Sequence, residues 1–191
     1  TNTTQIATTA FVQAAASSFG SLESNATDKT VWNNGKGNTG TNISFGEFAL
    51  SSNSSTTLTT AIGHAAFGLL ASGNNNTALG SNAGYNSAVG NLTIANETIL
   101  IGSQSRTLVN NATNEIVIGY NAVGAGSNTA TLGNANITKT ILGGVIQKRA
   151  LDTAPASATA TGTTGEIRVT STHIYVCIAT NTWVHSVLTT W

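Results

Sequence analysis

The stretch NEIVIGYNAVGAGSNTATLGNANITKTILGG, residues 114–144, repeats one phrase: an apolar cluster that ends on a glycine, followed by small and polar residues. Within it the phrase occurs as EIVIG, TATLG and TILGG. Upstream it recurs as NISFG, TTAIG, NTALG, NSAVG and TILIG, which end at Gly46, Gly63, Gly80, Gly90 and Gly102. Self-similarity over such a short period is typical of a solenoid.

Each phrase alternates with period two, so it predicts a short strand, and the glycine then turns the chain. In EIVIG, for example, Ile116 and Ile118 lie on one face and Val117 on the other. Three of the intervals between the glycines are equal (63 − 46 = 80 − 63 = 119 − 102 = 17), and the others are 10, 12 or 14. We expect stacked coils about 4.8 Å apart over residues 41–144. We expect the apolar residue before each glycine to pack within a rung. The structural residues of the repeat are then the pairs Phe45 and Gly46, Ile62 and Gly63, Leu79 and Gly80, Ile101 and Gly102, Ile118 and Gly119, and Leu132 and Gly133.

The residues around the strands indicate a narrow coil with sharp corners. The residue three beyond the glycine is small in five phrases, namely Ala49, Ala66, Ala83, Ser105 and Ala122. Asn-rich segments such as GNNN and GSN supply the positive φ angles that tight corners need. A coil filled with Ala and Thr buries little compared with the ~1.5 to 3 kcal/mol of a fully buried Leu. We therefore expect copies of the chain to associate symmetrically.

The composition excludes several classes of function. Charged residues make up only 7% of the 191 residues and the formal net charge is zero, so there is no basic footprint for nucleic acid. No run of ~20 apolar residues could insert into a membrane, and no signal peptide is recognisable. The single cysteine, Cys177, allows neither a disulfide nor a Cys-based zinc site within one chain. The first residue is Thr1 rather than Met, so the completeness of the N-terminus stays open.

The two ends differ from the repeat. Residues 4–19 are rich in Ala and predict a short helix within an N-terminal segment and connector of residues 1–40. Residues 145–164 have the composition of a linker. Residues 165–191 predict a small antiparallel meander with strands near 166–169, 173–179 and 183–189. This module holds Tyr175, Trp183 and Trp191, of which we expect Trp183 to be core and Trp191 to be available for contact.

Three segments resemble one family. They are QIATTAFVQAA (5–15), the repeats NTALGSNAG (76–84) and GSNTATLGNANITKTILGG (126–144), and the terminal GEIRV…IYVCIATNTW…TTW (165–191). In this order they resemble the trimeric tail-fibre and related fibre proteins of tailed bacteriophages. The repeats are also similar to those in the heads of trimeric autotransporter adhesins, although neither an anchoring barrel nor a long heptad stalk follows. The phage resemblance implies an elongated homotrimer on a virion.

Motifs that would indicate enzyme chemistry or a cofactor are weak. GKGNTG, residues 35–40, formally matches a dinucleotide fingerprint, but a predicted strand follows it where a helix should begin. The residues His64, His173 and His185 are not spaced as metal ligands, although one His per chain could meet on a trimer axis. The chain has only seven acidic residues, and none forms a close pair in sequence of the kind that glycoside hydrolysis needs. We expect no enzyme, no cofactor and no metal site.

The sequence thus predicts a mainly all-β protein: a trimeric β-solenoid shaft with a short N-terminal helix and a small C-terminal antiparallel β module. The resemblance implies a virion structural fibre protein, namely a phage tail fibre that mediates attachment to the host surface. It would be located on the virion, at the phage tail or the capsid surface. Its partners would be two further copies, other virion proteins, and a host polysaccharide or protein. The alternatives are a capsid decoration, head-fibre or cement protein, a bacterial trimeric adhesin head, and an ice-binding solenoid. The candidate receptor contacts are Trp191, Tyr175, Asn74, Asn75 and Asn76.

Overall fold

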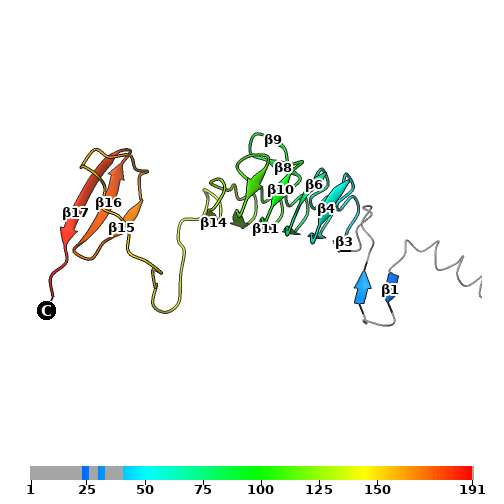
Figure 1. Ribbon diagram of the computed structural model, residues 1–191, viewed down its shortest axis with the longest axis horizontal. Coiled ribbons are helices and arrows are strands. Elements are labelled where there is room, and N and C mark those ends of the chain that lie inside the picture. The colour runs from blue at the N-terminus through cyan, green and yellow to red at the C-terminus, as the bar shows by residue number, and fades with distance from the viewer. Residues whose placement is uncertain (1–22, 26–29, 33–40, 191) are drawn as a thin grey trace, which may run out of the picture. The chain divides into compact units, whose positions relative to one another are not determined.

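The computed structural model describes residues 23–25, 30–32 and 41–190, and the chain divides into two compact units, Thr1–Lys139 and Thr140–Trp191. The described residues form strands and no helix (Figure 1). The expected helix at residues 4–19 and the candidate contact Trp191 both lie outside the described residues. An antiparallel pair that the sequence did not predict, β1 (Glu23–Asn25) and β2 (Thr30–Trp32), precedes the repeats.

The repeats form a parallel β-solenoid, as predicted (Figure 1). Each strand of its six-stranded main sheet pairs in register with its equivalents in the adjacent coils. The strands start at positions 43, 60, 77, 99, 116 and 130, so the successive coil lengths are 17, 17, 22, 17 and 14. The strands are β3 (Ile43–Phe45), β5 (Thr60–Ile62), β7 (Thr77–Leu79), β11 (Ile99–Ile101), β13 (Ile116–Ile118) and β14 (Ala130–Leu132).

A second row of short parallel strands closes the other side of the coil. Within it β4 (Ser55–Thr57) pairs with β6 (Ser72–Asn74), and β10 (Ala95–Asn96) pairs with β12 (Ala112–Thr113). Buried Asn and Thr side chains hold the corner where the chain returns to the main sheet. Asn76, for instance, donates from Nδ2 to the carbonyl of Ala95 at 2.8 Å, and its Oδ1 accepts from the Thr98 backbone N–H at 3.0 Å. Each coil is thereby bonded to the next on both sides.

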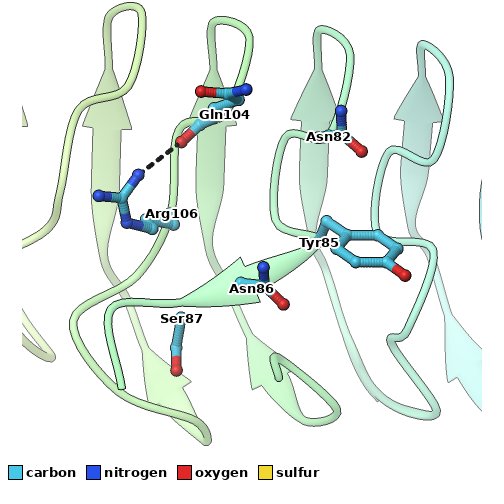
Figure 2. A pocket seen from close by; sticks show the side chains of 6 residues that line it. All are labelled: Asn82, Tyr85, Asn86, Ser87, Gln104 and Arg106. Atoms are coloured by element: carbon cyan, nitrogen blue, oxygen red, sulfur yellow. Dashed lines mark hydrogen bonds between the residues drawn. The ribbon is translucent and has the colours of Figure 1, made fainter. Parts of the chain in front are cut away.

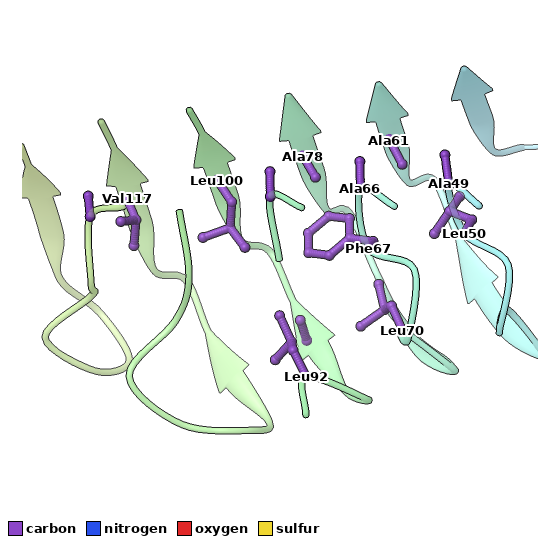
Figure 3. Close-up of a cluster of buried hydrophobic side chains, with 13 residues drawn as sticks. Ala49, Leu50, Ala61, Ala66, Phe67, Leu70, Ala78, Leu92, Leu100 and Val117 are labelled. Carbon is purple, nitrogen blue, oxygen red and sulfur yellow. The ribbon is translucent and has the colours of Figure 1, made fainter. Parts of the chain in front are cut away.

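The interior takes the middle residue of the strands of the main sheet (Figure 3). Ala61, Ala78, Leu100 and Val117 are fully buried. The residue before the glycine points outward instead, so Leu79 is 46% exposed and Ile118 is 37% exposed. The expectation that this residue packs inside a rung is therefore wrong for the single chain. Period-two alternation defines two faces of a strand, but both faces here are apolar, so the pattern could not say which is internal.

The small residues three beyond the glycines line the same interior, and all five are buried, as the narrow coil required. Larger side chains fit where a neighbouring coil has a glycine. The ring of the fully buried Phe67 lies against Gly84 of the next coil, where an added Cβ would come within 2.4 Å of it. Packing between coils is therefore complementary in size.

Glycine is required where the main strands end, because the coils approach each other closely there. Gly63 has a φ of +132°, and a Cβ at this position would lie 2.5 Å from the carbonyl oxygen of Gly80 in the next coil. Equally close stacking on the backbone of the next coil recurs at Gly46, Gly80 and Gly102. Positive φ angles at corners are also adopted by Asn75, Asn82 and Asn128 of the GNNN and GSN segments, as predicted. Other corners adopt them at residues that are not Asn, such as Phe48, Ala65 and Gln104.

Two of the phrases are not rungs. NSAVG, which ends at Gly90, forms a short antiparallel hairpin of β8 (Asn86–Ser87) and β9 (Gly90–Asn91). This hairpin lengthens the coil between β7 and β11, which we call the long coil. TILGG contains no strand and is exposed, so the ladder ends with β14 at Leu132 and not at Gly144. Both phrases lack the register partner in a neighbouring coil that makes a solenoid strand.

The C-terminal unit is the expected antiparallel meander of β15 (Ile167–Val169), β16 (His173–Ala179) and β17 (Thr182–Val187). Trp183 is 5% exposed, which confirms it as core. The segment that we expected to be a linker supplies part of this core. The Trp183 indole N–H donates to the carbonyl of Ala160 at 3.0 Å, and Asp152 accepts from the Val169 N–H at 2.7 Å. The packed module therefore begins near Asp152 and not at Gly165.

Candidate functional site

The outer face of the six-stranded sheet carries a continuous row of apolar side chains along the solenoid. Each strand directs its first and third side chains outward, and the third is apolar in every coil. This row consists of Phe45, Ile62, Leu79, Ile101, Ile118 and Leu132. The first positions are Ile43, Thr60, Thr77, Ile99, Ile116 and Ala130. We call these twelve side chains the outer face.

The outer face carries no charged residue, and its rows run about 24 Å along six rungs at the usual strand spacing. Its side chains are half-buried or exposed in the single chain, with Ile43 at 42%, Ile62 at 39% and Leu132 at 59%. Soluble monomers rarely expose so continuous an apolar stripe. A parallel sheet with such a face is suited to packing against another copy of itself.

The C-terminal module has an apolar face of the same kind. One side of its sheet is covered by residues 152–164, through their contacts with Trp183. On the other side lie the apolar positions that pair across the strands, Ile167 with Val176 and Val169 with Ile174. Ile167 is 58% exposed. This module therefore also has apolar surface beyond what its own fold buries.

Tyr175 lies in a cluster of rings on the covered side of the module. Its ring centroid is 5.5 Å from those of His173 and His185, and the two imidazoles are 4.9 Å apart. A small hollow of about 230 Å³ lies between Tyr175, Trp183, His185 and Pro155. The structure thus brings together two of the three histidines, although one is on β16 and the other on β17. Among the described residues, no three His, Cys, Asp or Glu side chains are grouped as metal ligands.

The Asn-rich corner divides into two kinds of residue. Asn74 and Asn75 are exposed, so the structure leaves both accessible for contact. Asn76 is only 1% exposed and bonds to the backbone of the next coil. Its selection as a contact residue is therefore wrong, because its amide completes hydrogen bonds inside the solenoid.

A polar hollow of about 340 Å³, absent from the sequence-based prediction, lies beside the β8–β9 hairpin (Figure 2). It is lined by Asn82, Tyr85, Asn86, Ser87, Gln104 and Arg106, and we call it the Tyr85 hollow. The greater length of the long coil could have pointed to the site, because insertions in solenoids emerge as loops on one face. The misassigned NSAVG phrase concealed this insertion.

Charged residues of the C-terminal unit form ion pairs within that unit. Lys148 pairs with Asp152 at 2.7 Å, and Arg168 pairs with Glu166 at 2.7 Å while lying 4.8 Å from the centre of the Trp183 ring. The Lys148 ammonium and the Val169 N–H lower the pKa of Asp152. Arg168 and the Thr163 N–H lower the pKa of Glu166. These carboxylates are therefore stabilised in their ionised form.

In the part of the chain that the structure describes, no helix is long and apolar enough to cross a membrane. The chain matches no family model, no curated protein and no solved structure.

Proposed function

We propose that the chain is part of a homotrimeric virion fibre of a bacteriophage, with the solenoid as its shaft, and that the fibre attaches to the host surface. The observation that carries this proposal is the uncharged outer face of the six-stranded sheet. Its exposed Ile and Leu side chains would be removed from water if the sheets of three chains packed around a common axis. The resemblance to phage fibres favours three copies over two.

The energetics also favour association. The interior of each coil holds mainly Ala, Thr and a few larger side chains, so the single chain gains little burial per rung. Packing the outer faces together would add a second apolar core along all six rungs. The apolar face of the C-terminal module offers a further surface for the same assembly. Trimerisation would therefore stabilise the fold as well as build the fibre.

The mass of the purified chain tests the assembly. Light scattering should give about three times the 19.3 kDa of one chain. A mass near that of one chain, with the β-rich circular dichroism spectrum retained, would refute the trimer.

Labelling of particles tests the location. Antibodies against residues 41–139 should decorate virions of the phage that encodes the chain. Gold at the tail supports attachment, whereas gold over the head would support the capsid decoration alternative. Absence of the chain from purified particles by mass spectrometry would refute the virion assignment.

A further inference from the structure

We infer that the Tyr85 hollow is a binding site for an acidic saccharide, in which a sugar carboxylate lies on Arg106 and the sugar ring lies beside Tyr85. This inference rests on the proposed function, because it gives the fibre a receptor chemistry. It places recognition on the shaft rather than on the Asn74 corner or the C-terminal aromatics.

The hollow is formed by the long coil with its inserted hairpin and by the coil that follows it. The hairpin of β8 and β9 forms one wall with Asn86, while Tyr85 precedes it at the corner (Figure 2). Asn82 and Gln104 occupy equivalent corner positions in successive coils, and both have positive φ. Their backbone N–H groups bond to the preceding coil, at 2.8 Å for Asn82 and 2.9 Å for Gln104. The side chains are thus displayed from a rigid backbone.

Three of the six lining side chains of the hollow make hydrogen bonds within the protein, those of Asn82, Ser87 and Arg106. Among the described residues, the side chains of Tyr85, Asn86 and Gln104 have no hydrogen-bond partner, whereas Ser87 is buried and donates to the carbonyl of Gly90. An amide offers both donors and an acceptor, which suits the hydroxyls of a sugar. A half-buried tyrosine adds an apolar ring face with a polar tip.

Arg106 gives the hollow its charge. Its Nη1 donates to the carbonyl of Gln104 at 3.3 Å and to Oδ1 of Asn121, which fixes the guanidinium without neutralising it. The ion pairs found among the described residues involve Lys148 and Arg168, so Arg106 has no carboxylate partner there. The Nε–H and Nη2–H edge bonds to none of the described residues, and this edge matches a carboxylate in a bidentate geometry.

The site is compatible with the proposed trimer. Its lining residues follow β7 and β11 in their coils, where the chain passes between the two sheets, and none of them belongs to the outer face. Its volume is at the lower end of the ~300 to 1,000 Å³ usual for ligand pockets, which fits one or two sugar units of a longer chain. A trimer would present three such sites, and binding to a polymer would gain from this multivalency.

Titration calorimetry with defined oligosaccharides tests the site. The probes are hexamers of galacturonic acid, mannuronic acid and guluronic acid, together with a sialyl-lactose, and each acidic hexamer is compared with its neutral methyl ester. We expect at least one acid to bind and its ester to bind at least ~10-fold more weakly, since a charge-assisted pair is lost. Failure of all four acids to bind the wild-type chain would overturn the inference, as would equal affinity for acid and ester.

Variants localise the binding. Arg106→Gln should weaken acid binding by ~10-fold and abolish the preference for acid over ester, and Tyr85→Ala and Asn86→Ala should each weaken both. Tyr120→Ala and Arg149→Gln are matched controls, because both residues are exposed and neither lines the hollow. Circular dichroism and light scattering on each variant exclude misfolding. Asn86 is an exposed hairpin residue, so its variant should keep the fold even if the Tyr85 variant does not. Wild-type affinity in Arg106→Gln would overturn the site.

The outcome can be separated from that of the proposed function. A trimer found on virions that binds no acidic saccharide would refute only the Tyr85 site. A monomeric chain that binds the acid through Arg106 would support the site and refute the homotrimer.

Discussion

Leu79→Asp distinguishes the inside of the coil from the proposed interface between chains. Leu79 is 46% exposed in the single chain, so about half of the ~1.5 to 3 kcal/mol for burying a Leu is still to be gained, or ~0.7 to 1.4 kcal/mol per chain. In the proposed trimer, three such side chains would meet at one rung and contribute ~2 to 4 kcal/mol together. In the Leu79→Asp trimer, this burial energy would be lost. Three carboxylates at that rung would also destabilise the trimer by several kcal/mol per charge, through desolvation and mutual repulsion.

The single coil should tolerate the same substitution. An outward Asp in a strand costs on the order of 1 kcal/mol through propensity, with a similar loss of packing against its neighbours. Ala78→Asp, one residue earlier, places the carboxylate in the fully buried interior and should unfold the coil. Asn75→Asp, at an exposed corner with a φ of 56°, should change neither the folding of the coil nor the association of the chains, because Asp tolerates this conformation.

Light scattering and circular dichroism together check the three variants. We expect Leu79→Asp to give a folded monomer, Ala78→Asp to lose the β signal, and Asn75→Asp to behave as wild type. A Leu79→Asp protein that remains a trimer of unchanged thermal stability would refute the assignment of the outer face as the interface.

The remaining predictions concern stability, measured by thermal and urea unfolding. Gly80→Ala should lower the free energy of unfolding by about 2 kcal/mol or more, because φ is +132° and the added Cβ would lie 2.7 Å from the backbone of the next coil. Gly143→Ala is the control: this residue has open space around it, so its substitution should change the free energy of unfolding by less than about 0.5 kcal/mol. Glu115→Ala should cost about 2 to 4 kcal/mol of stability, because this fully buried side chain accepts a hydrogen bond from the Gly126 N–H at 2.8 Å. Glu115→Gln keeps an oxygen acceptor and should cost less than about 1 kcal/mol. Equal losses in the two variants would contradict the role of this hydrogen bond. The C-terminal module should lose stability as the pH falls below about 4. Lys148 lowers the pKa of Asp152 in the folded state. The stability that Asp152 contributes is therefore fully present above its pKa in the unfolded chain, and it is lost as the pH falls through its pKa in the folded chain. Trp183 fluorescence should report this loss of stability, and Asp152→Asn should reduce its pH dependence. An unchanged pH profile in this variant would count against the role of Asp152.

The solenoid was predictable from the sequence, because the evidence for it is local and repeated. A strand phrase, a glycine and an Asn-rich corner occur at intervals of one coil, and each coil meets only its neighbours, so the period fixes the register. The same alternation and turn residues were enough to place the three strands of the C-terminal meander. The core position of Trp183 followed because a small module needs a large side chain in its centre.

Which face of each strand is internal depends on packing between the sheets, and the sequence pattern did not reveal it. In β7 the interior takes Ala78 and leaves the larger Leu79 outside, whereas in β11 it takes Leu100, so residue size alone does not identify the internal face. Contacts distant in sequence also decided that NSAVG is an insertion, because a rung requires a partner in the adjacent coil and the phrase pairs with itself. The Tyr85 hollow depends on both facts. Its side chains come from two coils and a hairpin, and no local pattern brings Asn86 beside Arg106.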